Sequence, residues 1–174
     1  NAVRIVRGLP ADRPVIFVPD RNLGDHVAQA TGRELILHPG YCPTHQRLLP
    51  EIVRARRAEY PDAQVLAHPE CMRETRALAD FVGSTSEIIE RCRGAAAGRF
   101  IIATENGVLH RLRRDLPDCE FIAASEEQGV CPNMKRTTLE LILAALEGDS
   151  TGVTIPADLA ARARQPLDRM LALS

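Results

Sequence analysis

The sequence predicts an α/β protein built on mostly parallel sheets, and three observations support this prediction. Short apolar runs alternate with helical patterns, as in successive right-handed βαβ units. The hydrophobic fraction is 45%, whereas aromatic residues make up only 3%, so the core must be built from Ala, Val, Ile and Leu. This composition is typical of parallel strands that are covered by helices on both faces. A length of 174 residues allows one large domain or two small ones.

The first elements are marked by the residues that begin and end them. Val15–Val18 is expected to form a buried strand. A helix is expected over Asp20–Ala30, with Asp20 as its N-cap and Gly32 just beyond its end. A second strand is expected at Leu35–Leu37.

The alternation of strands and helices continues along the chain. Further strands are expected at Val65–Ala67, Phe81–Val82, Phe100–Ala103 and Phe121–Ala123. Further helices are expected at Pro50–Tyr60, Met72–Ala79, Thr85–Cys92, Glu105–Leu116 and Arg136–Leu146, with a last one after Pro156. A proline opens the helix at Pro50, Ser84 precedes the one at Thr85, and Gly148 follows the one that ends near Leu146.

The charge pattern excludes several partners. The net charge is −1, and the short cluster Arg111–Arg114 is interpreted as the solvated face of a helix, so nucleic acid is not an expected partner. No apolar run approaches the ~20 residues that a membrane span needs, and no signal peptide is visible. The first residue is Asn1 rather than Met, so an N-terminal address could have been lost. A cytoplasmic protein is expected.

The cysteines point away from disulfides. An odd number of cysteines in a chain without a secretory signal argues against a disulfide framework. The absence of a C-x-x-C pair disfavours a zinc finger or a local ferredoxin motif. Free thiols, metal ligands and catalytic thiols remain open. The five residues are Cys42, Cys71, Cys92, Cys119 and Cys131.

An internal repeat singles out two of these cysteines. The stretches 15–42 and 100–131 each run through a strand, an acidic residue, a helix and a strand, and each ends in a Gly-x-Cys-Pro tetrapeptide that contains Cys42 or Cys131. This repeat predicts two similar α/β modules. Each module presents a cysteine just past the carboxyl end of a strand, where open α/β sheets bind ligands.

Two interpretations of Cys42 and Cys131 stay open. A thiolate between Gly and Pro, on a sharply turning backbone, is a good ligand for a soft metal. Buried structural cysteines are the alternative. The duplication favours the metal, but two ligands do not complete a cluster, so a third must come from elsewhere.

Other polar residues follow predicted strands. His45 is either a hydrogen-bonded loop histidine or a donor to a bound carboxylate or phosphate. His68-Pro69-Glu70 is either a rigid acid–base pair or a helix N-terminus with a favourably placed glutamate.

The run Gly83–Ser86 predicts an anion site at a helix N-terminus, and Ser84 with Glu87 predicts a capping box; the two are compatible. Cys92 and Cys119 are interpreted as structural. Cys71 is interpreted in the same way, although it adjoins the candidate Glu70 and could reach a ligand.

Along nearly its whole length the sequence resembles the quinolinate synthase family. The resemblance rests on several stretches in a fixed order, and the combination is more specific than any one of them. They are Val18-Pro19-Asp20-Arg21-Asn22-Leu23-Gly24, Gly40-Tyr41-Cys42-Pro43-Thr44-His45, His68-Pro69-Glu70-Cys71, Asp80-Phe81-Val82-Gly83-Ser84-Thr85-Ser86, Cys131-Pro132-Asn133-Met134-Lys135 and the tail from Ile155-Pro156 through Arg169-Met170-Leu171.

The resemblance implies repeated three-layer αβα modules with parallel sheets, two of the family's three pseudo-symmetric domains around one [4Fe–4S] cluster. Residues 1–43 would be the remainder of the second domain, 44–135 the third domain, and 136–174 the C-terminal helices. Cys42 and Cys131 would be two of the three cluster ligands. The other ligand would lie in a missing N-terminal domain, so the chain alone is expected to be inactive.

The resemblance also implies a reaction, in which a transferase of NAD biosynthesis condenses iminoaspartate with dihydroxyacetone phosphate to give quinolinate, phosphate and water. The cluster would act as a Lewis acid. The catalytic residues would be Glu70, His68 and His45. The substrate-binding residues would be His68, Pro69, Glu70, Ser84 and Thr85. A homodimer is left open.

Two other classes of function remain. One is a metal-free α/β enzyme or binding domain whose anion site is the run 84–86. The other is a structural fragment that packs against a partner. Brown colour after anaerobic reconstitution would distinguish the cluster protein from both.

Overall fold

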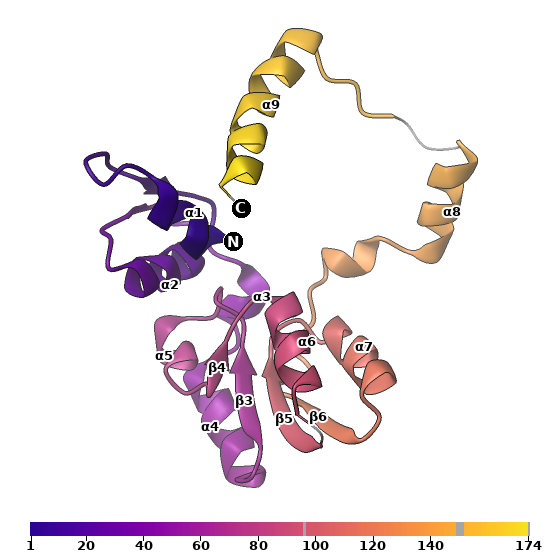
Figure 1. Ribbon diagram of the computed structural model, residues 1–174. Coiled ribbons are helices and arrows are strands. Elements are labelled where there is room, and N and C mark those ends of the chain that lie inside the picture. Colours follow the sequence, from indigo (N-terminus) through magenta and orange to yellow (C-terminus); the bar gives the residue numbers. More distant parts are fainter. Residues whose placement is uncertain (96, 149–151, 174) are drawn as a thin grey trace. The chain divides into compact units, whose positions relative to one another are not determined.

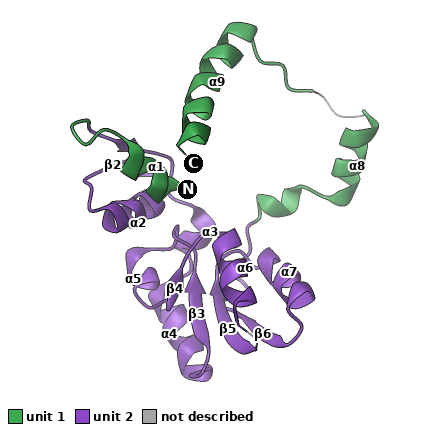
Figure 2. Ribbon diagram, in the orientation of Figure 1, with its two compact units in different colours: residues 1–13, 132–174 green, residues 14–131 purple. Residues whose placement is uncertain are grey.

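The computed structural model describes residues 1–95, 97–148 and 152–173 (Figure 1). These residues form two compact units (Figure 2): residues 14–131 make up the larger one, and residues 1–13 with 132–174 make up the smaller one. The domain borders that the resemblance implies, after residues 43 and 135, stay a prediction.

The main sheet of the larger unit consists of parallel strands in the order β4-β3-β5-β6. Their bounds are β3 Gln64–Ala67, β4 Phe81–Val82, β5 Gly98–Ala103 and β6 Cys119–Ala123. In the register Val65 pairs with Ile101, and Phe100 pairs with Phe121. The α/β fold class that the sequence predicts is therefore confirmed.

Alternating residues of the central strands pack on opposite faces of this sheet. On one face Leu66, Phe100 and Ile102 pack with residues of α6 (Thr85–Arg93) and α7 (Gly107–Asp115). The rings of Phe100 and Phe121 stack there with their centroids 5.6 Å apart.

The other face buries the intervening residues of the same strands. Val65, Ala67, Ile101 and Ala103 pack with Leu48 and with Val53 of α4 (Pro50–Glu59). With helices on both faces, this sheet forms a three-layer αβα module, as Figure 1 shows. Burial on both faces explains why these strands read as continuous apolar runs in the sequence.

A smaller parallel sheet pairs β1 (Ile16–Phe17) with β2 (Ile36–Leu37). Helix α2 (Arg21–Thr31) lies so close to it that a Cβ on Gly24 would approach Leu37 Cδ2 to 2.6 Å. Asp20 caps α2, and Gly32 ends it with a φ of 67°. Both capping predictions are confirmed.

Some predicted helices are shorter than the sequence suggests, because extended residues or tighter turns interrupt them. The helix expected over Met72–Ala79 contains a single short segment, α5 (Arg73–Arg76), because Met72 has a non-helical ψ of 153° and Leu78 and Ala79 donate to carbonyls only three residues back. The short helix α3 (Pro43–Gln46), which carries His45, was not predicted.

Among its described residues, the smaller unit contains helices but no strands. It comprises α1 Ala2–Gly8, the 3₁₀ helix η1 Met134–Arg136, α8 Leu139–Glu147 and α9 Ala157–Ala172. The helix expected over residues 136–146 is divided because Thr137 is extended, and Thr138 then caps α8 by accepting from the Leu141 N–H. Within the described ranges, no helix combines the length and the hydropathy needed to cross a bilayer.

A charged contact joins two helices of the larger unit, α2 and α5. The Asp25 carboxylate of α2 accepts hydrogen bonds from Arg73 and Arg76 of α5. Only 5% of the Arg76 side chain is exposed. The hydrogen bond from Arg73, together with the charges of both arginines, lowers the pKa of Asp25 below its ordinary value.

We predict that Asp25→Asn lowers the free energy of unfolding of the chain at pH 7 by about 2 kcal/mol, the scale of a charge-assisted hydrogen bond. The pKa of Asp25 is lower in the folded state, so its contribution is complete above the ordinary value of 3.8 and is lost as the pH falls through the folded-state pKa. Urea unfolding at pH 7 and at about pH 2 should show the difference at the higher pH alone. The exposed Asp118→Asn is the control, and an equal loss at both pH values would contradict the prediction.

Candidate functional site

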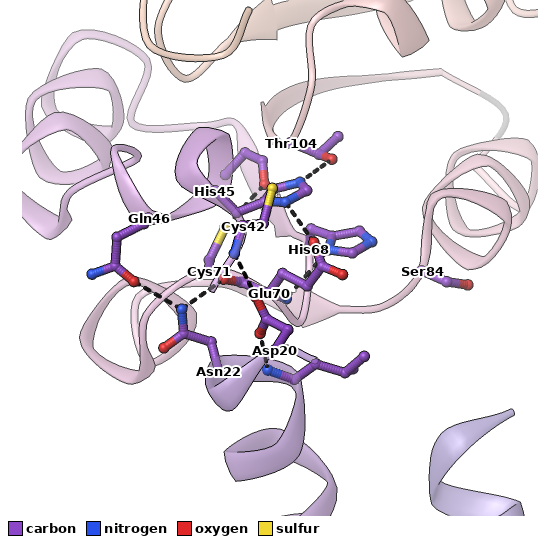
Figure 3. A network of polar contacts seen from close by, with 12 residues as sticks. Asp20, Asn22, Cys42, His45, Gln46, His68, Glu70, Cys71, Ser84 and Thr104 are labelled. Carbon is purple, nitrogen blue, oxygen red and sulfur yellow. Dashed lines mark hydrogen bonds and ion pairs between the residues drawn. The ribbon is translucent and has the colours of Figure 1, made fainter. Parts of the chain in front are cut away.

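The candidate site lies at the carboxyl ends of the strands in the larger unit. His68 follows β3, Thr104 follows β5, and Asp20 follows β1 after an intervening Val-Pro pair. Figure 3 shows these side chains converging with Cys42 and Glu70. Parallel strands end at one edge of a sheet, so they bring together residues that are distant in the sequence.

His45 lies at the centre of this network. It is 8% exposed. Its Nδ1 lies 3.0 Å from Glu70 Oε2, and its Nε2 lies 2.9 Å from Thr104 Oγ1. Because a carboxylate only accepts hydrogen bonds, Nδ1 donates to Glu70, and in the neutral ring Nε2 would then accept from the Thr104 hydroxyl. The ring of His68 stacks on His45, with the centroids 4.3 Å apart.

Glu70 is held by its backbone as well as by His45. Its N–H donates to His68 Nδ1 at 3.2 Å, and its carbonyl accepts from Asn22 Nδ2 at 3.1 Å. Asn22 also donates to Gln46 Oε1, at 2.9 Å. The Cys42 thiol lies within 4.8 Å of the Glu70 carboxylate. One carboxylate thus contacts a histidine and lies near a cysteine.

Burial and close contacts shift the pKa values of these groups. Burial, with a further contribution from His45, lowers the pKa of His68 to about 4. The hydrogen bond from His45 lowers the pKa of Glu70, against the effect of burial. Burial and the neighbouring Glu70 raise the pKa of Cys42. At neutral pH the site therefore contains a neutral His68, an ionised Glu70 and a protonated Cys42.

A buried carboxylate fixes the loop that carries Cys42. Asp20 is 4% exposed. Its Oδ1 accepts from the Leu23 N–H at 2.7 Å, and its Oδ2 accepts from the Cys42 N–H at 2.6 Å. The N–H of the next residue, Arg21, donates to the Gly40 carbonyl at 2.8 Å. We call this arrangement, in which one carboxylate accepts from the start of a helix and from a cysteine N–H, a carboxylate clamp.

A second carboxylate clamp fixes the loop of Cys131. Glu105 accepts from the Gly107 N–H at 2.7 Å and from the Cys131 N–H at 3.4 Å. The N–H of the next residue, Asn106, donates to the Gly129 carbonyl at 2.8 Å. The repeat seen in the sequence therefore extends to the hydrogen bonds of both cysteine loops.

Close packing requires the glycine that lies two residues before each of these cysteines. A Cβ on Gly40 would lie 2.5 Å from the Pro19 carbonyl oxygen, and one on Gly129 would lie 2.9 Å from the Ser125 carbonyl oxygen. The two cysteine loops are also linked, because Arg47, just after α3, donates to the Val130 carbonyl at 3.2 Å. Whether the two sulfurs face one cleft stays a prediction.

The other cysteines occupy structural positions. Cys71 is fully buried, its thiol donates to the Ala103 carbonyl at 3.4 Å, and burial raises its pKa to about 12. Cys92 is fully buried in α6, where burial raises its pKa to about 11. Cys119 begins β6, at the opposite end of the strands from the site.

At the predicted anion site at the start of α6, the polar groups hydrogen-bond to one another. Ser84 and Glu87 form the capping box, in which the Ser84 N–H and hydroxyl each donate to Glu87 Oε2 at 2.7 Å. Ser84 lies apart from the network of Figure 3. The charge of Glu87 still acts on His68, opposing the fall in its pKa. Substrate binding by Ser84 and Thr85 stays a prediction.

Several residues of the site were not predicted. Thr104 was passed over, although a polar residue directly after a buried strand was the available signal. Asp20 was recognised as an N-cap alone, and Glu105 only as the start of a helix. The acidic residue at the same place in both halves of the repeat was the signal for the clamps.

Comparison with known proteins agrees with the order of these residues. The family model described as Quinolinate synthetase A protein matches residues 1–172. The chain belongs to this family. The quinolinate synthase of Geotalea uraniireducens is 50% identical over 173 residues, which cover 99% of this chain and 56% of that protein. Those of Geobacter metallireducens and Thermotoga maritima are 50% and 43% identical, over 173 and 175 residues that cover 99% of this chain and 56% and 57% of those proteins.

The chain therefore spans a little over half the length of the curated quinolinate synthases it matches. Membership of the quinolinate synthetase A family connects it with NAD biosynthesis at the level of the family.

We predict that Asp20→Asn lowers the free energy of unfolding by about 1–3 kcal/mol, because the amide loses one of the two acceptors and leaves a buried N–H without a partner. Glu105→Gln should cost less, since its oxygen lies 3.4 Å from the Cys131 nitrogen, against 2.6 Å for the Asp20–Cys42 contact. Urea unfolding tests the order, and hydrogen exchange should accelerate in Asp20→Asn at the Leu23 or the Cys42 amide, whichever faces the new NH₂ group. The reverse order, or unchanged exchange at both amides, would contradict the clamp.

Proposed function

We propose that this chain supplies two cluster ligands and the acid–base residues of a quinolinate synthase. The proposed reaction condenses iminoaspartate with dihydroxyacetone phosphate to give quinolinate, phosphate and water. The observation that carries the proposal is the position of the Glu70 carboxylate, which lies 3.0 Å from His45 Nδ1 and within 4.8 Å of the Cys42 thiol, so that a proton acceptor lies beside a candidate metal ligand. Membership of the quinolinate synthetase A family supports it.

The chemistry of the donors fits a [4Fe–4S] cluster. Iron–sulfur clusters are held by cysteine thiolates, and Cys42 and Cys131 are partly exposed thiols on matching loops. Cys71 and Cys92 are buried in the core, and Cys119 lies at the other end of the sheet. We infer that a third thiolate comes from a part of the protein outside these residues.

When bound, the cluster would supply a Lewis acid that polarises a substrate oxygen or nitrogen. Glu70 would take a proton from the substrate and return it to a leaving hydroxyl. His45 would orient the Glu70 carboxylate and favour its ionised form through the hydrogen bond from Nδ1.

His68 suits the binding of a substrate carboxylate. Its Nδ1 accepts from the Glu70 N–H, so in the neutral ring Nε2 carries the proton and can donate. Pro69 would keep His68 and Glu70 at a fixed separation. Ser84 and Thr85, at the start of α6, would hold a second carboxylate or a phosphate, which helix N-termini favour.

The remaining assignments follow from the same proposal. The enzyme would be cytoplasmic, its partners would be the two small substrates and the rest of the protein, and a homodimer is compatible with it. The metal-free alternative depends on the anion site at Ser84, whose hydroxyl donates to Glu87. That contact favours the capping role.

We predict that Glu70→Gln in the complete enzyme retains the cluster and lowers the rate of quinolinate formation by about 10²–10⁴-fold. The amide preserves the size of the side chain but cannot accept and return a proton. Glu74→Gln, on an exposed side chain four residues along, is the matched control. Steady-state rates and iron analysis check both variants, and a near-normal rate for Glu70→Gln would remove Glu70 from the chemistry.

We also predict that Cys42→Ser and Cys131→Ser each abolish cluster retention in the complete enzyme, whereas Cys92→Ser and Cys119→Ser retain it. The first two remove a proposed thiolate ligand, and the others alter a buried or distant thiol. The 174-residue chain by itself should retain no stable cluster, because it offers two thiolates at the site. Iron and sulfide analysis after anaerobic reconstitution and desalting is the measurement. A full complement of iron on the isolated chain would overturn the ligand count.

A further inference from the structure

Cys42, His45 and Glu70 bring three different metal-binding groups together. The ligand atoms that these side chains offer all lie within 4.8 Å of one another. His45 Nδ1 and Glu70 Oε2 are 3.0 Å apart. His45 is buried, whereas Cys42 and Glu70 are partly exposed, so the group has access to solvent.

We propose that these three side chains form a site for a single Zn²⁺ ion, which uses Cys42 but not Cys131. The site deepens the proposed function, because zinc and the cluster would compete for the same thiolate. Zinc binding itself does not depend on the cluster, since all three of its ligands lie in this chain.

The donor set fits the coordination chemistry of zinc. Zinc binds thiolate sulfur at about 2.3 Å and imidazole nitrogen or carboxylate oxygen at about 2.0–2.2 Å, in a tetrahedral arrangement. Such bonds place neighbouring donors roughly 3.3–3.8 Å apart, so the widest pair here would close by about 1 Å. Three protein ligands leave the fourth position for water, as in sites with an open coordination position.

The surrounding contacts hold each ligand in place. A histidine that binds metal through one nitrogen usually donates a hydrogen bond from the other. With Nδ1 on the metal, His45 Nε2 would carry the proton and donate to Thr104 Oγ1, which lies 2.9 Å away. The Asp20 carboxylate holds the backbone of Cys42, and Asn22 holds the backbone of Glu70.

The donor types also select the metal. A set containing a thiolate and an imidazole disfavours Mg²⁺ and Ca²⁺, which prefer oxygen ligands. Among divalent first-row metals, zinc binds such sites more tightly than Fe²⁺. Zinc on Cys42 would therefore resist displacement by ferrous iron and would exclude the cluster from this position.

The test uses the metal-free, reduced 174-residue chain. Titration with Zn²⁺ against a chromophoric chelator should give one ion per chain, and Co²⁺ should give a thiolate-to-metal charge-transfer band. Cys42→Ser, His45→Gln and Glu70→Gln should each weaken zinc binding at least about tenfold, and Thr104→Val should weaken it about 10–100-fold. Cys131→Ser and Cys119→Ser should leave the zinc affinity unchanged. Circular dichroism checks that each variant is folded.

Three results would contradict the proposed zinc site. An absence of one-to-one binding would do so, as would an unchanged affinity in Cys42→Ser. A loss in Cys131→Ser as large as that in Cys42→Ser would show that the cysteine pair binds the ion instead. The cluster is tested separately, because Cys131→Ser should abolish the cluster in the complete enzyme while sparing zinc binding by the chain. Failure of zinc binding would leave the cluster proposal standing.

Discussion

The hydrogen bonds from the backbone N–H groups of Cys42 and Cys131 to buried carboxylates are the interaction on which the candidate site depends. Asp20 and Glu105 each join a cysteine loop to the start of a helix. A carboxylate buried in this way must have its acceptors satisfied, and here the backbone satisfies them. The position of each cysteine is therefore tied to the packing of a helix on its sheet.

The parallel sheets provide the second constraint. They end at the edge where His68 and Thr104 emerge, and α3 brings His45 between those two residues. The charged contact of Asp25 with α5 holds α2 in place, and Asn22 of the same helix donates to the Glu70 carbonyl. The acid–base residues and Cys42 thus come from different elements, and a few polar contacts fix the positions of these elements.

Much of the fold could be predicted from the sequence, because its signals are local. Apolar runs marked the strands, and capping residues such as Asp20, Gly32 and Ser84 marked the ends of helices. The helix at residues 72–79 was overestimated, since propensity does not reveal that the backbone of Met72 is non-helical or that Thr75 donates its hydroxyl to the Leu48 carbonyl.

The site could be predicted only in part, and for a physical reason. The repeated tetrapeptides singled out Cys42 and Cys131, but the partners of His45 depend on contacts across 25 and 59 residues of sequence. No local pattern specifies Thr104 as a partner of His45. The register of β3 and β5, in which Ala67 pairs with Ala103, places Thr104 beside His68, and α3 then brings His45 to both residues.

The carboxylate clamps also affect how a metal would enter the protein. Every hydrogen bond in them joins protein atoms, so the cysteine loops lose their conformational entropy when the chain folds rather than when metal binds. In zinc fingers, by contrast, metal binding drives folding. Metal would thus bind to cysteine loops that are already folded. Which metal arrives first would then matter more than the order in which the parts of the chain fold.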